Sequence, residues 1–117
     1  MDKTVINSTL KNIRDEINFQ KNVLVTSEQR KILEIAVHLA FYRYEHIVNL
    51  DLQITYQSKY EIKKKAENYL HNIVWLVQKL VDSNKTAEID RYYKIFVNLC
   101  KDFKSYCSEW YIPIKPG

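Results

Sequence analysis

The sequence predicts an all-α protein, a single domain built as a bundle of about four helices. Its 117 residues include only three strong helix breakers, Pro113, Pro116 and Gly117, and all three stand at the C-terminus. Hydrophobic residues make up 46% and charged residues 27%, which is typical of a folded globular domain. We therefore assign residues 1–111 to the bundle and residues 112–117 to an extended tail.

Two helices are predicted in the first half of the chain. The first has one apolar stripe formed by Ile6, Leu10, Ile13 and Ile17. The second begins after Thr26, because a threonine followed three residues later by a glutamine has the spacing of a capping box. Its middle is apolar on most sides, so we expect it to be the central helix of the bundle. Its apolar residues are Ile32, Leu33, Ile35, Ala36, Leu39, Ala40, Ile47 and Leu50.

Residues 50–57 alternate between apolar and polar, a pattern that by itself is typical of a strand. No second stretch of the sequence alternates in the same way, and a lone strand could not pair its backbone groups. The same residues extend the helical stripe of Ile47, Leu50 and Ile54. We therefore predict helix for this segment.

Two further helices are predicted in the second half. The third has a wide apolar face between Ala66 and Val81, and residues 82–86 form a turn. The fourth begins near Thr86, where Glu88 and Asp90 favour the positive end of the helix dipole. Its predicted core stripe consists of Ile89, Tyr93, Phe96, Leu99, Cys100, Phe103, Cys107 and Trp110.

Several classes of chemistry do not fit the sequence. Phosphate-binding loops and nucleophile elbows need glycine within the chain, so no cofactor is predicted. Cys100 and Cys107 lie two helical turns apart, about 10 Å, which is too far for a mutual disulfide, and we expect them to be buried structural thiols. Glu34 and His38 lie one turn apart, but helical di-iron sites need more ligands, so no metal is predicted either.

Catalysis and membrane association are not expected. The helical HEPN ribonucleases have a histidine four to six residues after an arginine, whereas His38 follows Arg30 by eight residues and His46 follows Arg43 by three. No serine or cysteine has an evident base partner. The sequence has neither the apolar core of a signal peptide nor a stretch long enough to span a membrane. We expect a cytoplasmic, non-catalytic protein without a small-molecule substrate.

The net charge is +4, and two basic features stand out along the chain. One is the start of the third helix and the other is the polar face of the fourth. They comprise Lys59, Lys63, Lys64 and Lys65, and then Arg91, Lys94, Asn98, Lys101 and Lys104. These features indicate either a surface that follows a phosphate backbone or an ordinary solvated face.

Three stretches resemble the small helical subunits of type III-A CRISPR effector complexes. Residues 24–33 are similar to that family's Leu-Thr-Thr-Ser-x-x-Arg-x-Leu, and residues 52–57 to its Leu-x-x-x-x-Tyr-x-Ala-Gly-Arg. The last helix, residues 93–106, aligns without a gap at basic, leucine and aromatic positions. The family's Ala-Gly-Arg is replaced here by Ser58-Lys59-Tyr60.

The resemblance implies a non-catalytic subunit that stacks along a guide–target duplex. Its partners would be the RNA backbone, other effector subunits and copies of itself. The candidate nucleic-acid-binding residues are Ser27, Arg30, Lys31, Lys59, Lys63, Lys64, Arg91, Lys94, Lys101 and Lys104. The alternative hypothesis is a small helical protein-binding factor, such as an immunity protein, an antitoxin or a phage-encoded inhibitor.

Overall fold

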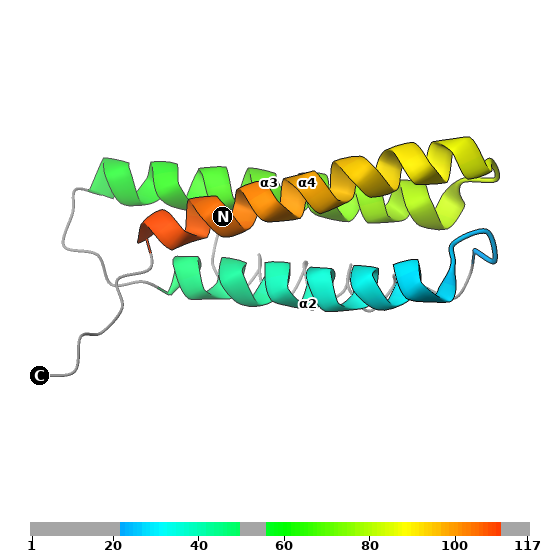
Figure 1. The fold of residues 1–117 in the computed structure, drawn as a ribbon. Coiled ribbons are helices and arrows are strands. Elements are labelled where there is room, and N and C mark those ends of the chain that lie inside the picture. The colour runs from blue at the N-terminus through cyan, green and yellow to red at the C-terminus, as the bar shows by residue number, and fades with distance from the viewer. Residues whose placement is uncertain (1–21, 50–55, 111–117) are drawn as a thin grey trace, which may run out of the picture.

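The computed structural model describes residues 22–49 and 56–110, and the regular secondary structure within them is α-helix alone. Helix α2 spans Ser27–Val48, α3 spans Tyr56–Asp82 and α4 spans Thr86–Trp110. The predicted all-α class is confirmed, with three helices in the described part of the chain. The predicted first helix, residues 50–55 and the tail 112–117 lie outside the described residues. Helices α2 and α4 run in the same direction and α3 runs opposite to both (Figure 1).

The start of α2 is fixed by the capping box that the sequence predicts. The Thr26 side chain accepts a hydrogen bond from the Gln29 backbone N–H at 3.0 Å. In return, the Gln29 side-chain oxygen accepts one from the Thr26 backbone N–H, also at 3.0 Å. Two backbone donors that the helix itself cannot satisfy therefore find partners within four residues.

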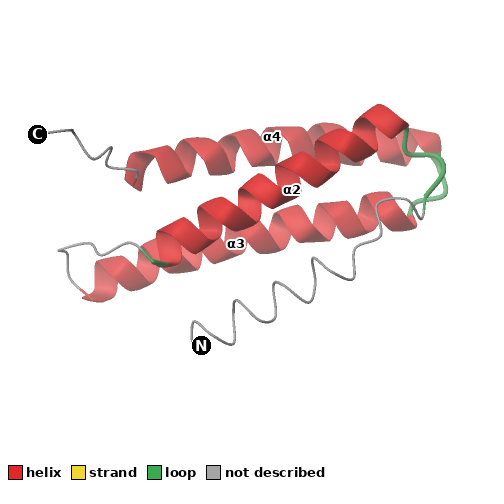
Figure 2. Cartoon of the chain, turned by 90° about the horizontal axis from the view of Figure 1, so that it is seen from below, coloured by secondary structure: helices red, strands yellow, loops and turns green. Residues whose placement is uncertain are grey.

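The turn between α3 and α4 also lies where the sequence predicts it. Three residues, Ser83 to Lys85, join the two helices, and the Ser83 hydroxyl donates to the Glu88 carboxylate at 3.0 Å. The buried side chain of Asn22 donates to the carbonyls of Leu80 at 2.8 Å and Ser83 at 2.6 Å. The segment that leads into α2 is thus fastened to the α3–α4 turn, and both loops lie at one end of the bundle (Figure 2).

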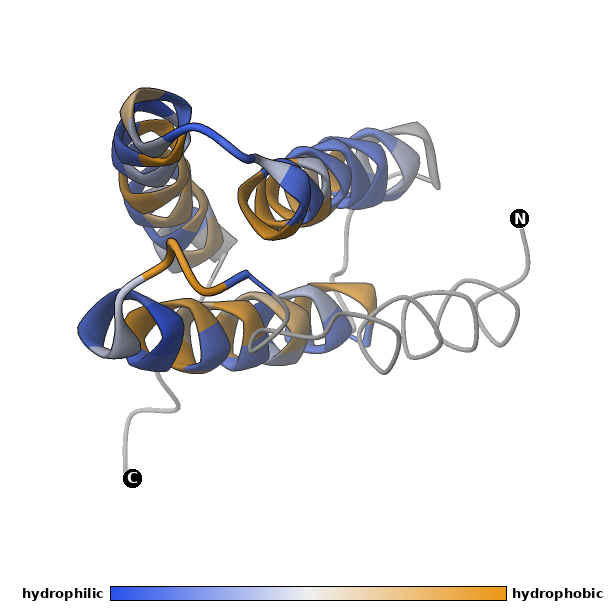
Figure 3. Ribbon diagram, turned by 90° about the vertical axis from the view of Figure 1, so that its right-hand side faces the viewer, coloured by the Kyte–Doolittle hydropathy of each residue, from blue (hydrophilic) through white to orange (hydrophobic). Residues whose placement is uncertain are grey.

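Among the described helices α3 contributes the most completely buried side chains, whereas the second predicted helix, α2, was expected to be central. Five side chains of α3 have no exposed surface at all, and the apolar faces of all three helices turn inward (Figure 3). These five are Ala66, Leu70, Ile73, Val77 and Leu80. Helix α2 buries only one side of its apolar surface, because α3 and α4 do not enclose it.

An aromatic cluster joins α3 to α4. The ring of Tyr69 stacks on Phe103 at 5.3 Å between centroids and lies 5.4 Å from the ring of Tyr106. The hydroxyl of Tyr106 donates to the Ile62 carbonyl at 3.1 Å. Tyr106 is not among the predicted core residues of the last helix; its buried hydroxyl reaches a carbonyl 44 residues away, a partner that the spacing within one helix cannot indicate.

Candidate functional site

The ten predicted nucleic-acid-binding residues lie in three separate places. Ser27, Arg30 and Lys31 stand at the start of α2. Lys59, Lys63 and Lys64 stand at the start of α3, which lies at the opposite end of the bundle (Figure 1). At 1.5 Å per residue, the two groups are about 25 Å apart along the bundle axis. The others follow the length of α4, so the ten residues do not form one surface.

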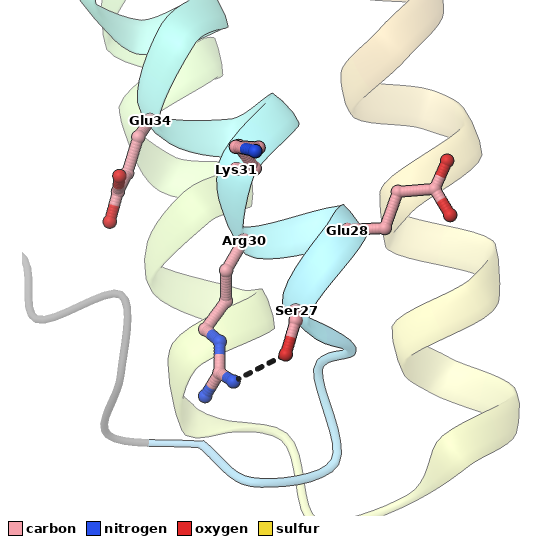
Figure 4. Close-up of a pocket in the computed structure, with 5 residues that line it drawn as sticks. All are labelled: Ser27, Glu28, Arg30, Lys31 and Glu34. Atoms are coloured by element: carbon pink, nitrogen blue, oxygen red, sulfur yellow. Dashed lines mark hydrogen bonds between the residues drawn. The ribbon is translucent and has the colours of Figure 1, made fainter.

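The group at the start of α2 has no excess of positive charge. A shallow hollow there is lined by Ser27, Glu28, Arg30, Lys31 and Glu34 (Figure 4). The Arg30 guanidinium donates to the Ser27 hydroxyl at 3.2 Å. Two carboxylates in the same two helical turns offset the two cations, so this hollow would attract a phosphate weakly.

The lysines at the start of α3 differ in their surroundings. Lys59 is half-buried, whereas Lys63, Lys64 and Lys65 are exposed. The Lys65 ammonium lies 5.0 Å from the centre of the Tyr106 ring, within range of a cation–π contact. This cluster therefore contributes in part to the packing of α3 on α4.

The basic stripe of α4 lies on one exposed face, as its spacing of three, four and three residues predicts. Arg91, Lys94, Asn98 and Lys101 are all exposed, and the Arg91 guanidinium lies 5.1 Å from the centre of the Tyr92 ring. The helix as a whole is electrically balanced, because it contains four basic and four acidic side chains. The acidic ones are Glu88, Asp90, Asp102 and Glu109. The stripe is therefore of mixed charge, with acids beside its cations.

A groove that the sequence did not predict lies between α2 and α4. Two overlapping hollows share Leu39, Arg43 and Lys104, and together they form what we call the α2/α4 groove. Its lining from α2 is Ile32, Ala36, Leu39, Tyr42, Arg43 and His46, and from α4 it is Phe96, Val97, Cys100, Lys101, Lys104, Cys107 and Ser108. The floor is apolar and the ionisable side chains at its edges are cationic or histidine.

Large apolar side chains on α2 continue from the groove onto the open surface. Four of them, spaced three, four and three residues apart, form what we call the α2 outer stripe: Ile32, Ile35, Leu39 and Tyr42. Their exposed fractions are 39%, 56%, 44% and 68% in that order. Contiguous exposed apolar surface of this kind is typical of an interaction surface. Two apolar stripes on one helix were the signal in the sequence, and both were expected to face the core.

The two cysteines are weak nucleophiles. Both are free and half-buried at the groove, and burial raises the pKa of each thiol from 9.0 to about 11, although Arg43 acts in the opposite direction. Both thiols are therefore protonated at neutral pH. In the core, burial and then Glu67 raise the pKa of Tyr44 to about 12, so its hydroxyl also stays neutral.

The described residues bring together no metal-binding cluster of three or more histidine, cysteine, aspartate or glutamate side chains. The predicted neighbours Glu34 and His38 are both exposed on α2. None of the helices within residues 22–49 and 56–110 has the length and apolar character needed to cross a membrane.

Comparison with known proteins gives no relative for this chain. No protein family model, no curated protein and no solved structure matches the sequence or the fold. The resemblance to CRISPR small subunits therefore remains a prediction from sequence motifs.

Proposed function

We propose that this chain is a non-catalytic, helical protein-binding factor that contacts another protein through the α2 outer stripe. The observation that supports the proposal is the exposure of four large apolar side chains along one side of α2. Exposing them to water costs roughly 25 cal/mol for each Å² of apolar surface, a cost that a protein partner would remove. The two protonated thiols at the groove fit a binding role better than a nucleophilic one.

Site-specific photo-crosslinking in the native host tests this function. A photoreactive residue at Ile35 should form a discrete adduct that protease removes and ribonuclease does not. The same residue at Asn98, exposed on α4 and not part of the groove lining, is the matched control and should give no such adduct. Adding Leu39→Asp to the Ile35 variant should abolish the adduct. An adduct equally strong from both positions would contradict the proposal.

The second candidate is contact with an RNA backbone, as in a subunit of an RNA-guided complex. The observation that favours it is the single exposed face shared by Lys94, Asn98 and Lys101 on α4. Such contacts release counterions, so affinity should fall with salt. Labelled single-stranded RNA titrated at several salt concentrations tests this candidate.

The double variant Lys94→Ala with Lys101→Ala should weaken RNA binding and reduce the salt slope by about 1.4. Lys79→Ala with Lys85→Ala removes two exposed lysines elsewhere on the bundle and serves as the control. Equal losses in both double variants, or no RNA binding at low salt, would reject this candidate.

A further inference from the structure

We infer that the α2/α4 groove binds an amphipathic helix of a partner protein, and that acidic side chains border the apolar face of that helix. This inference rests on the proposed protein-binding function and specifies the chemistry of the partner. Two features support it: the apolar floor of the groove and the positive charge of its edges.

The floor of the groove suits the apolar face of a helix. Ile32 and Leu39 are partly exposed on the α2 side, and Val97 and Cys100 are half-buried on the α4 side. From Ile32 to His46 the α2 wall is about 21 Å long, which matches roughly four turns of a bound helix. Helices that bind in grooves insert apolar side chains at spacings of three and four residues, and this length accommodates several such anchors.

The edges of the groove select for negative charge. Arg43 comes from α2, and Lys101 and Lys104 come from α4. Among the described residues that line the groove none is acidic, although α2 and α4 each contain carboxylates elsewhere. A bound helix with glutamate or aspartate on both borders of its apolar face would place carboxylates beside these cations, which favours both orientation and association rate.

The same charges argue against two other occupants. A second copy of the chain docked groove to groove would bring Arg43, Lys101 and Lys104 against their own counterparts, and like charges repel. Residues 1–21 of this chain contain apolar side chains, but their four basic residues outnumber their three acidic ones. Neither occupant supplies the acidic borders that the groove favours.

The experiment uses the full chain and two synthetic helical peptides of roughly four turns. Both carry leucines at spacings of three and four residues, and they differ only in having glutamates or lysines beside the leucines. Fluorescence anisotropy should show the glutamate peptide binding with a Kd on the order of micromolar, and the lysine peptide at least about tenfold more weakly.

Charge reversal locates the contact. Arg43→Glu with Lys104→Glu should weaken binding of the glutamate peptide by about tenfold or more and strengthen binding of the lysine peptide. Arg91→Glu with Lys94→Glu makes the same change in net charge at exposed positions of α4 that do not line the groove, and should leave both affinities within about twofold at physiological salt. Circular dichroism verifies that each variant keeps its helices.

Each other outcome overturns the inference and identifies a different occupant or none. If the glutamate peptide binds only after Ile13→Glu, the occupant of the groove is residues 1–21 of the same chain. A concentration-dependent dimer in sedimentation that Leu39→Asp abolishes would assign it to a second copy. Single-stranded RNA binding lost in Arg43→Glu with Lys104→Glu, without peptide binding, would assign it to nucleic acid. Equal affinity for both peptides would show that the groove does not prefer a helix with acidic borders.

Failure of this inference is distinguishable from failure of the proposed function. If neither peptide discriminates but the Ile35 crosslink still forms its protein adduct, the protein-binding function stands and the acidic helix is the wrong partner. If the crosslink also fails, the function itself is wrong.

Discussion

Helix α4 meets its two neighbours in different ways. Its interface with α3 is filled by stacked aromatic rings, and a buried hydroxyl is satisfied across it at 3.1 Å. Its contact with α2 is closely packed around the buried Phe96. Toward the surface the α2/α4 groove separates the two helices, and Leu39 remains 44% exposed there. The same helix therefore has a closed interface on one side and an open one on the other.

Chain connectivity accounts for the difference. Helices α3 and α4 are antiparallel and are joined by only three residues, so their side chains can interlock along their whole length. Helices α2 and α4 run parallel and are joined only through α3, so no short turn draws them together. A closed interface supplies stability, whereas an open one leaves apolar surface free for a partner.

The largest effect is expected at the closed interface. Phe103→Ala should lower the free energy of unfolding by about 3–5 kcal/mol, because it leaves a cavity beside Tyr69. Urea unfolding followed by circular dichroism measures this loss. Ile95→Ala, at a half-exposed position on the same helix, should cost less than about 1 kcal/mol. Similar losses in the two variants would mean that the interface is not closed.

The reaction rates of the Cys100 and Cys107 thiols report on the open interface between α2 and α4. A pKa of about 11 instead of 9.0 leaves roughly one hundredth of the thiolate found in the unfolded chain. Because a thiolate of higher pKa is also more nucleophilic, iodoacetamide at pH 8 should modify folded Cys100 and Cys107 at least roughly tenfold more slowly than urea-unfolded chain, as followed by mass spectrometry. The single variants Cys100→Ser and Cys107→Ser assign each rate.

The sign of the pH dependence follows from the same shift. As pH rises above 9, the unfolded chain loses its thiol protons first, so the unfolded state binds fewer protons than the folded state. The folded state should then lose stability between pH 9 and about 11, and the labelling rate should rise over that range. Equal labelling of folded and unfolded chain at pH 8 would show that the thiols are not desolvated.

A smaller effect is expected where α2 begins. Thr26→Ala removes the hydroxyl that accepts from Gln29 and should cost about 1 kcal/mol in urea unfolding. Thr26→Ser keeps a hydroxyl acceptor and should lower the free energy of unfolding by only roughly a few tenths of a kcal/mol. Helix α2 packs closely on one side only, so it can open locally without the rest of the bundle. Hydrogen-exchange protection should therefore decrease mainly in α2 and less in α3. Uniform loss of protection across the bundle would contradict this view.

The smallest effect is expected at the wall of the groove. Leu39→Ala should change the free energy of unfolding by less than about 1 kcal/mol, because the side chain is already partly in water. Leu33→Ala makes the identical change on the other side of α2, where the side chain is 1% exposed, and should cost about 2–5 kcal/mol. Equal costs would mean that the groove is closed in solution.

Local signals in the sequence predicted the fold well. The capping box at Thr26 and the polar run at residues 82–86 fixed the start of α2 and the turn before α4, because both depend on chemistry within a few residues. The candidate site was less predictable. The spacing of Lys94 and Lys101 was enough to place both on one exposed face, but it did not indicate that Arg30 and Lys59 lie at opposite ends of the bundle.

The sequence by itself determined that this protein is helical, where α2 and α4 begin and which face of α4 is polar, since periodicity and capping act within single helices. Only the tertiary structure decided that α3 supplies the most completely buried side chains and that Leu33, not Leu39, is in the core. The physical reason is that α2 has two apolar sides of similar character, and the one that is buried depends on where α3 and α4 pack. The α2/α4 groove exists because that packing covers only one of them.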